Sequence, residues 1–329
     1  MTNVLVLGGT GFLGAHLVRS LALFGHDVTL STRGTTNPDL FEDVPKLNGD
    51  RDGDMSRLAG TSWDVIYDLS GQHPRHVRDV AALVNDDAHY VFISTGNVYS
   101  DMSVEGPLTE DSPVFDVAEG DVDPNSMDAY GQFKALSESE VRRRFARHHI
   151  VRPGVIVGLG DPSDRLTYWV MRFADSGRHI VPEAIDASLQ FIDVRDLAEW
   201  LVHLGMAAES GTFNAVAPPT TLSSFLSEVE RVAGSSVDRI GISESFLEDH
   251  QIRPWLDIPM WLPPSDTSRH AFFNVEARLA RHHGLKTRSA EENIRGILDW
   301  SDGVRLRDHP RHGLSAAKEV DLVGVLGAP

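Results

Sequence analysis

Apolar residues in this chain gather in short runs separated by helical patterns. Residues 4–7 (Val-Leu-Val-Leu) form a run of four apolar positions, which is typical of a strand buried on both faces of a parallel sheet. Apolar residues then recur at helical spacing, at Leu13, Leu17, Leu21 and Phe24. The chain is therefore expected to begin with a strand, a turn and a helix.

The same alternation continues along much of the chain. Further strands are predicted at 26–30, 63–69, 90–93, 149–157, 190–194 and 211–216, with helices at 74–84, 130–147 and 166–174. This order is typical of βαβ units. It predicts an α/β fold with a Rossmann-type, doubly wound, mostly parallel sheet built from residues 1–155 and a later return near 190–217. Residues 156–329 are expected to form mainly a smaller C-terminal α/β substrate domain, with few strands after Thr221.

The turn after the first strand is rich in glycine. Residues 9, 11 and 14 give the spacing G-x-G-x-x-G, and residues 8, 11 and 14 give a related one. Such glycines allow a tight turn, the approach of a pyrophosphate and close packing of helix on strand, while the helix N-terminus attracts the phosphates. The pattern predicts a dinucleotide site, with a purely structural turn as the alternative. The predicted contacts here are Gly8, Thr10, Gly11, Phe12, Leu13 and Gly14.

The end of the second strand bears on the choice of cofactor. An NAD site usually has Asp or Glu at this place, whereas this chain has Ser31, Thr32 and Arg33. Without the acid a 2′-phosphate is not repelled, and Arg33 can pair with it. NADP(H) is therefore preferred and NAD(H) remains possible; a solvated turn is the alternative for Arg33. Further predicted cofactor contacts are Asp50, which an ordinary acidic loop explains equally well, and Arg51, Ser70 and Pro153.

Charge and composition exclude several classes of function. The formal net charge of −18 argues against nonspecific binding to nucleic acid or to an anionic membrane. The chain has no cysteine, so disulfides and thiolate chemistry are excluded. Its 15 histidines show no H-E-x-x-H motif, so no metal site is predicted. No apolar run reaches the roughly 20 residues of a membrane span, and the early first strand leaves no room for a signal peptide, so a cytoplasmic location is expected.

Candidate catalytic residues follow a strand and open a helix. Ser94 and Thr95 come directly after the strand at 90–93, where ligands of such sheets bind. Tyr130 and Lys134 are four residues apart and share a helix face. The positive charge of Lys134 is expected to lower the pKa of the Tyr130 phenol, which would then exchange protons near neutral pH. The acidic segment 100–127 is expected to be a loop beside the site. For the tryptophans beside prolines, Trp255 and Trp261, a place in the core is favoured over the substrate pocket.

Three motifs together resemble the extended short-chain dehydrogenase/reductase superfamily, in its NAD-dependent epimerase/dehydratase group. They are the glycine turn at 8–14, Ser94-Thr95 followed by Val98-Tyr99, and Tyr130-x-x-x-Lys134. Arg152-Pro153 and residues 191–198 resemble later landmarks of the group, so the similarity spans about 4–217. The resemblance implies that Thr95 bonds the substrate oxygen, Tyr130 is the acid/base, and Lys134 binds the nicotinamide ribose and tunes the tyrosine. It also implies a possible homodimer through two helices that flank the sheet.

One departure from the group narrows the expected activity. Dehydratases carry an acidic pair after the threonine, whereas this chain has Gly96 and Asn97, so dehydration is not expected. The favoured function is a carbonyl reductase or alcohol dehydrogenase that uses NAD(P)(H) and acts on a small molecule, with Tyr130 as general acid/base. Two alternatives stay open: an NAD-dependent sugar or nucleotide-sugar epimerase, and a nucleotide-binding regulator without catalysis.

Overall fold

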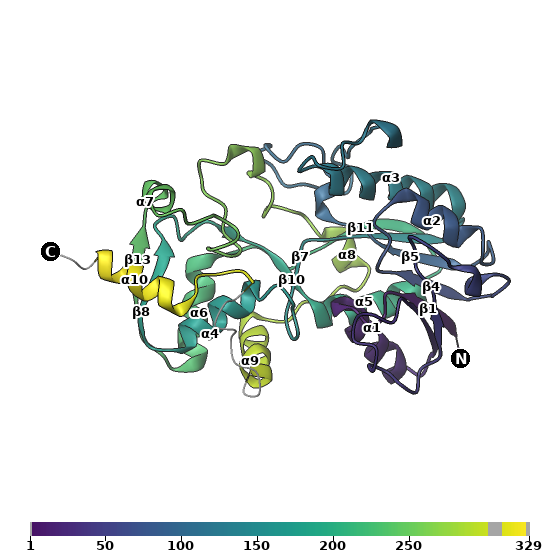
Figure 1. Ribbon diagram of the computed structural model, residues 1–329, viewed down its shortest axis with the longest axis horizontal. Coiled ribbons are helices and arrows are strands. Elements are labelled where there is room, and N and C mark those ends of the chain that lie inside the picture. Colours follow the sequence, from purple (N-terminus) through teal and green to yellow (C-terminus); the bar gives the residue numbers. More distant parts are fainter. Residues whose placement is uncertain (1, 302–310, 327–329) are drawn as a thin grey trace.

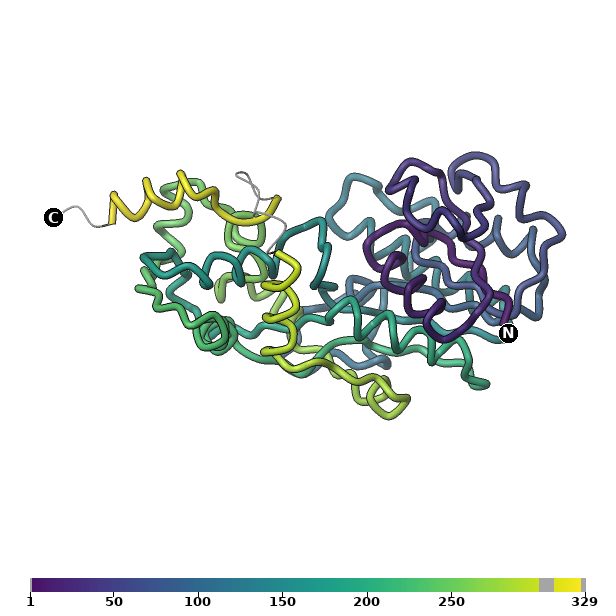
Figure 2. The backbone as a smooth tube through the Cα atoms, turned by 90° about the horizontal axis from the view of Figure 1, so that it is seen from below, coloured from purple at the N-terminus to yellow at the C-terminus, as the bar shows by residue number. Residues whose placement is uncertain are grey.

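The computed structural model describes residues 2–301 and 311–326 and consists of two parts lying side by side along the long axis (Figure 1). One part holds a large sheet with helices on both faces. The other holds α10 (Ala316–Leu326), which lies at the far end from the first strand (Figure 2). Two short strands, β7 (Val155–Val157) and β10 (Phe191–Asp193), pair with each other where the chain passes between the parts.

The large sheet has seven strands, and all of its strand pairs are parallel. From β1 the sheet extends one way through β2 and β3 and the other way through β4, β5 and β6, so it is doubly wound. Folds of this kind bind ligands at the switch point, which here lies between β1 and β4. The predicted fold class is confirmed. In spatial order the strands are β11 (Gly211–Ala215), β6 (His148–Pro153), β5 (His89–Ile93), β4 (Val65–Asp68), β1 (Asn3–Leu7), β2 (Asp27–Thr32) and β3 (Lys46–Asn48).

Helices cover both faces of this sheet. On one face α1 (Phe12–Leu23) packs against α5 (Val194–Gly205), and on the other α2 (Pro74–Ala81) packs against α3 (Ala129–Arg144). Along β1, Val4 and Val6 join the core on the first face, while Leu5 and Leu7 join the core on the second. Because successive side chains of a strand point to opposite faces, a strand covered on both sides is apolar at every position.

The second part has a core of its own, which includes Trp169, Phe173, Phe225 and Trp261. Its main strands, β8 (Gly177–Pro182) and β13 (Val237–Ile242), pair in parallel, and neither was predicted from the sequence pattern. In the described residues β13 is the one strand that begins after Thr221, in agreement with the expectation of few strands there; it lacks a clear apolar run. The remaining helices and strands are α4 (Arg165–Ala174), β9 (Ser188–Leu189), β12 (Thr220–Thr221), α6 (Leu222–Ala233), α7 (Glu244–Asp249), α8 (Arg278–His282) and α9 (Ala290–Ser301). Within the described ranges no helix combines the length and the apolar character needed to cross a bilayer.

Two histidines face each other inside the sheet. His89 of β5 and His149 of β6 are each 1% exposed, and their rings share a hydrogen bond of 2.9 Å between Nε2 and Nδ1. The Nδ1 atom of His89 also lies 3.0 Å from the carbonyl oxygen of Gly205. Burial lowers the pKa to about 4 for His89 and to about 3 for His149, so both rings are neutral at pH 7. Over the described ranges no three His, Asp or Glu side chains gather closely enough to hold a metal ion.

This pair makes stability depend on pH. Between pH 6.5 and pH 5 the unfolded histidines take up protons and the folded ones do not, so the free energy of unfolding should fall as the pH falls. The slope should be at most about 1.4 kcal/mol per pH unit for each histidine. Urea unfolding at several pH values measures it. The change His149→Gln should flatten the slope, whereas His270→Gln, at an exposed residue, should leave it as it is. An equal slope in the wild type and His149→Gln would contradict the assignment.

Candidate active site

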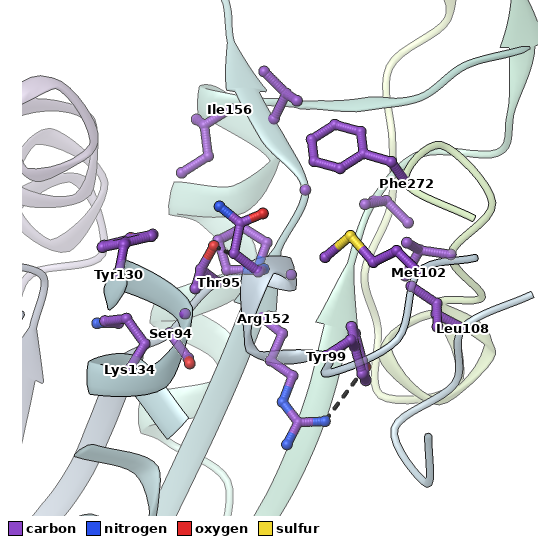
Figure 3. Close-up of a pocket in the computed structure, with 18 of the residues that line it drawn as sticks. Ser94, Thr95, Tyr99, Met102, Leu108, Tyr130, Lys134, Arg152, Ile156 and Phe272 are labelled. Carbon is purple, nitrogen blue, oxygen red and sulfur yellow. Dashed lines mark hydrogen bonds between the residues drawn. The ribbon is translucent and has the colours of Figure 1, made fainter. Parts of the chain in front are cut away.

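A cleft of about 1290 Å³ lies at the carboxyl ends of β5 and β6, where the two parts of the molecule meet (Figure 3). Phe12 and Leu13 of the glycine turn border it, as do Thr95, Tyr130 and Lys134. The loop that follows β5 contributes further lining residues, in agreement with its expected place beside the site. From the second part come Trp255 and Phe272, so Trp255 is a pocket residue, whereas Trp261 is buried in the core.

The two hydroxyl residues after β5, Ser94 and Thr95, form different hydrogen bonds. Ser94 is buried and donates its hydroxyl to Glu138 at 2.6 Å. Thr95 precedes a short 3-10 turn, Gly96–Val98, and its Oγ1 accepts the N–H of Asn97 at 3.2 Å. That bond uses the oxygen as an acceptor, and the Thr95 hydroxyl also bonds to the Tyr130 phenol, so the Thr95 and Tyr130 hydroxyls lie together in the lining of the cleft. Of the two hydroxyls, Thr95 is the one placed to hold a substrate oxygen.

Tyr130, the second residue of α3, lies at the mouth of the cleft and is 45% exposed. Burial of the rest of the side chain raises the pKa of its phenol, and a hydrogen bond with Thr95 acts in the opposite direction. The expectation that Lys134 lowers the pKa of Tyr130 is therefore wrong, because the ammonium group of Lys134 is bonded beneath the helix instead. At neutral pH the phenol is protonated and is a proton donor.

Lys134 reaches down from α3 to the ends of two strands. Its Nζ donates to the carbonyl oxygens of Gly71 and Ile93, both at 2.6 Å, and lies 3.9 Å from the centre of the Phe92 ring. Burial lowers the pKa of Lys134 to about 7, although the nearby carboxylates of Asp68 and Glu138 act to raise it. An ammonium group has three N–H bonds. In its charged form the Lys134 side chain therefore keeps one N–H for a ligand above the strand ends.

The glycine turn has the geometry of a phosphate cradle. Gly8 has a φ of +91°, which strains any residue with a side chain. A Cβ on Gly14 would lie 2.2 Å from the carbonyl oxygen of Gly8, so only glycine fits there. Helix α1 starts after Gly11 without a side-chain cap, which leaves the N–H groups of its first turn to a ligand. The residues of the turn thus fit a dinucleotide; Thr10 is buried beside them.

Of the contacts predicted for the adenine end of the cofactor, some are exposed to solvent and others are already bonded to protein side chains. Arg33 and Asp50 are exposed, while Ser31 and Thr32 are buried at the end of β2. Arg51 is not open, because it forms a two-pronged ion pair with Asp68. Its Nη1 also donates to the Ser70 hydroxyl at 3.1 Å, and the Tyr90 hydroxyl donates to Asp68 at 2.5 Å. Pro153 lines the cleft at the end of β6.

Asp68 was missed by the sequence analysis although it organises this group. It ends β4 and is fully buried, and burial alone would raise its pKa. The pair with Arg51 instead holds the pKa of the Asp68 carboxyl below its usual range, so it stays ionised. The sequence feature that could have revealed Asp68 is its charge at the end of the otherwise apolar strand β4.

Glu138 is the second buried carboxylate that sequence reasoning missed. It lies one turn beyond Lys134, is fully buried, and accepts two bonds from Arg152, at 2.9 Å and 2.7 Å. Arg152 also donates to the Tyr99 hydroxyl at 3.3 Å, and Tyr99 donates to Asn214 at 2.6 Å (Figure 3). This network joins α3 to β5, β6 and β11 behind the cleft. The sequence feature that could have revealed Glu138 is its spacing of four residues from Lys134, which places both side chains on the same face of α3.

Removing the charge of Glu138 should destabilise the protein. In Glu138→Gln the Arg152 guanidinium is left buried without a counter-charge, and the free energy of unfolding should fall by about 3 to 5 kcal/mol. Chemical denaturation at pH 7 measures this. The change Glu228→Gln, in a more exposed pair with Arg231, should have little effect. An equal decrease in the free energy of unfolding in both variants would show that the buried network stabilises the protein no more than an exposed ion pair does.

Known proteins resemble this chain over much of its length. The chloroplast stem-loop binding protein of 41 kDa b from Arabidopsis thaliana is 28% identical over 213 residues, which cover 60% of this chain and 53% of that protein. The match thus spans about half the length of that relative. Epimerase family protein SDR39U1 from Bos taurus is 28% identical over 258 residues, covering 72% of this chain and 81% of that protein.

A solved structure supports the fold. The UDP-glucose 4-epimerase of Thermotoga maritima, solved with UDP-glucose, superposes with a TM-score of 0.65 at 15% identity, covering 92% of this chain and 99% of that one.

The model of the NAD dependent epimerase/dehydratase family matches residues 4–215, which include the glycine turn, Thr95, Tyr130 and Lys134. The chain therefore belongs to the NAD-dependent epimerase/dehydratase family, within the extended short-chain dehydrogenase/reductase superfamily.

Proposed function

We propose that this chain is an NAD(P)(H)-dependent carbonyl reductase or alcohol dehydrogenase that acts on a small molecule. The observation that carries the proposal is the convergence of Thr95, Tyr130 and Lys134 on one cleft that also reaches the glycine turn. A substrate oxygen at Thr95 would thus lie in the same space as a cofactor whose phosphates bind at Gly8–Gly14. The family membership and the fit of the turn to a dinucleotide support a nicotinamide cofactor.

In this proposal the protein orients the substrate and moves one proton. The bound cofactor supplies the hydride for a carbonyl carbon. Thr95 donates a hydrogen bond to the carbonyl oxygen, and the Tyr130 phenol, protonated at neutral pH, gives that oxygen its proton. Lys134 keeps the start of α3 in place through Gly71 and Ile93 and offers its remaining N–H to the cofactor. Gly96 and Asn97 bring no carboxylate next to Thr95, which argues against dehydration.

A sugar or nucleotide-sugar epimerase is the second candidate. It is supported by the names of the family and of two similar proteins, an epimerase family protein and a UDP-glucose 4-epimerase. Such an enzyme would oxidise and re-reduce its substrate with one retained NAD. Denaturing the purified protein and identifying the released nucleotide by mass spectrometry distinguishes the two. Stoichiometric NAD would favour the epimerase, and an empty site or NADP would favour the reductase.

Binding without catalysis is the remaining candidate, since one relative is named as a stem-loop binding protein. The net charge of −18 opposes a nucleic-acid partner for this chain, because a polyanion binds to clustered positive charge. We therefore propose a small molecule as the ligand, with neither nucleic acid nor membrane as a partner. A homodimer through two helices that flank the sheet, one of them α3 with Tyr130 and Lys134, stays a proposal from the family resemblance.

The role of Tyr130 can be tested by removing one oxygen atom. In Tyr130→Phe the turnover number for carbonyl reduction should fall by about 10²- to 10⁴-fold, because the proton donor is lost. The dissociation constant for the cofactor should stay within about twofold. The same change at Tyr168, in the C-terminal core, should leave turnover intact. Turnover that survives in Tyr130→Phe would refute the acid/base assignment.

The preference for NADP(H) rests on Arg33. In Arg33→Ser the affinity for NADPH should fall by about tenfold, because a charge-assisted contact with the 2′-phosphate is lost, while the affinity for NADH stays unchanged. Fluorescence titration with each nucleotide measures both constants. Arg57→Ser, at another exposed arginine, is the control. An equal effect on NADPH and NADH would remove the basis for the preference.

A further inference from the structure

The wall of the cleft that faces Thr95 and Tyr130 is apolar. Met102, Leu108 and Phe272 lie across the cleft from the two catalytic candidates (Figure 3). Met102 and Leu108 belong to the loop after β5, and Phe272 comes from the second part of the molecule. Asp101 and Ser103 also line the cleft, but they are exposed and bonded to each other at 2.6 Å.

This wall limits what can be bound beside the reacting oxygen. A sugar carries hydroxyl groups on most of its carbons, and each hydroxyl that is buried without a hydrogen bond costs free energy. Side chains such as Met102 and Phe272 offer no strong donor or acceptor. A hydrocarbon body, in contrast, gains free energy from contact with them. The wall therefore favours a substrate that is apolar next to its carbonyl carbon.

Arg165, the first residue of α4, gives the same cleft a charged end. Its guanidinium lies 5.3 Å from the centre of the Trp255 ring, and its Nε is buried without a hydrogen-bond partner. Other arginines with largely buried side chains in the described ranges pair with carboxylates: Arg51, Arg152, Arg172, Arg195, Arg239 and Arg288. No carboxylate of the described residues forms an ion pair with Arg165. The guanidinium is thus available to an anion in the cleft.

Asp161, which also lines the cleft, is a carboxylate whose charge acts to raise the pKa of Arg165. Both of its oxygens accept the Ser163 hydroxyl, at 2.7 Å and 2.8 Å, and burial raises its pKa. The negative charge of Asp161 repels a dianion beside Arg165 more strongly than it repels a monoanion. Arg269, on the second part, also lines the cleft, but it is paired with Asp266 at 3.9 Å.

We propose that the substrate is a keto acid or hydroxy acid whose carboxylate binds Arg165 and whose apolar body lies against Met102, Leu108 and Phe272. This inference rests on the proposed reductase activity and names its substrate class. A carboxylate accepts two parallel N–H bonds from a guanidinium, so Arg165 fixes the orientation of the chain. In the reaction the carbonyl carbon gains hydride from NAD(P)H and the oxygen gains a proton from Tyr130. The products are an alcohol and NAD(P)⁺, the exposed Tyr130 regains its proton from water, and the carboxylate is unchanged.

A series of methyl ketones tests the inference. The compounds 4-oxopentanoate, 6-oxoheptanoate and 9-oxodecanoate are compared with their methyl esters as substrates with NADPH. For the chain length that spans the cleft, kcat/KM should be about 10- to 100-fold higher for the acid than for the ester, as expected for a hydrogen bond to a charged group. Arg165→Gln should remove this preference. Arg178→Gln, outside the cleft, should keep it.

A second measurement separates the binding site from the proposed activity. Calorimetry with decanoate and with methyl decanoate measures binding without turnover, in the wild type and in Arg165→Gln. If no ketone is reduced but decanoate binds in an Arg165-dependent way, the anion site stands and the reductase proposal fails. If ketones are reduced with equal efficiency as acid and ester, the inference is overturned and the reductase proposal stands. Tighter binding of decyl phosphate than of decanoate would overturn the choice of a carboxylate.

Discussion

The ammonium group of Lys134, bonded to the carbonyl oxygens of Gly71 and Ile93, is the contact on which the arrangement of the cleft depends. It joins α3 to the ends of β4 and β5, three elements that are distant in the sequence. Because Tyr130 lies one turn earlier on the same helix, its position follows from this contact. A long side chain buried in this way loses its conformational freedom, so the helix has one register relative to the sheet.

Two buried ion pairs, Arg51–Asp68 and Arg152–Glu138, lie on either side of this contact. Both carboxylates act to keep the pKa of Lys134 from falling further, and Arg51 opposes them. Buried pairs contribute little net stability, but breaking one leaves an uncompensated charge in a poorly solvating interior. Alternative arrangements of the strand ends are therefore penalised, and the cleft is preorganised before any ligand arrives.

The sheet could be predicted because each apolar run of strands such as β1 is covered on both faces. The pair β8 and β13 could not, because these strands pair only with each other and β13 is mostly half-exposed. In the site, the order of the glycine turn, the hydroxyl pair after a strand and Tyr130-x-x-x-Lys134, together with the family resemblance, was enough to select Thr95, Tyr130 and Lys134 as candidates. It could not select Asp68 or Glu138, whose partners become neighbours only through the fold. For the same reason the direction of the Tyr130 pKa shift was missed: it depends on where the Lys134 side chain is bonded, not on its distance along the helix.

The order of elements along the chain has a consequence for how the protein is made. Strand β11 completes the sheet beside β6, and α5 covers the apolar side of α1, yet both follow α4 and β8 in the sequence. During synthesis the first six strands emerge from the ribosome while the edge at β6 is unpaired and α5 is still absent from the helix layer that it forms with α1. An unpaired edge and an uncovered apolar face are the features that make nascent chains prone to association. The interval between the emergence of β6 and that of β11 is thus the period in which this chain most needs protection by a chaperone.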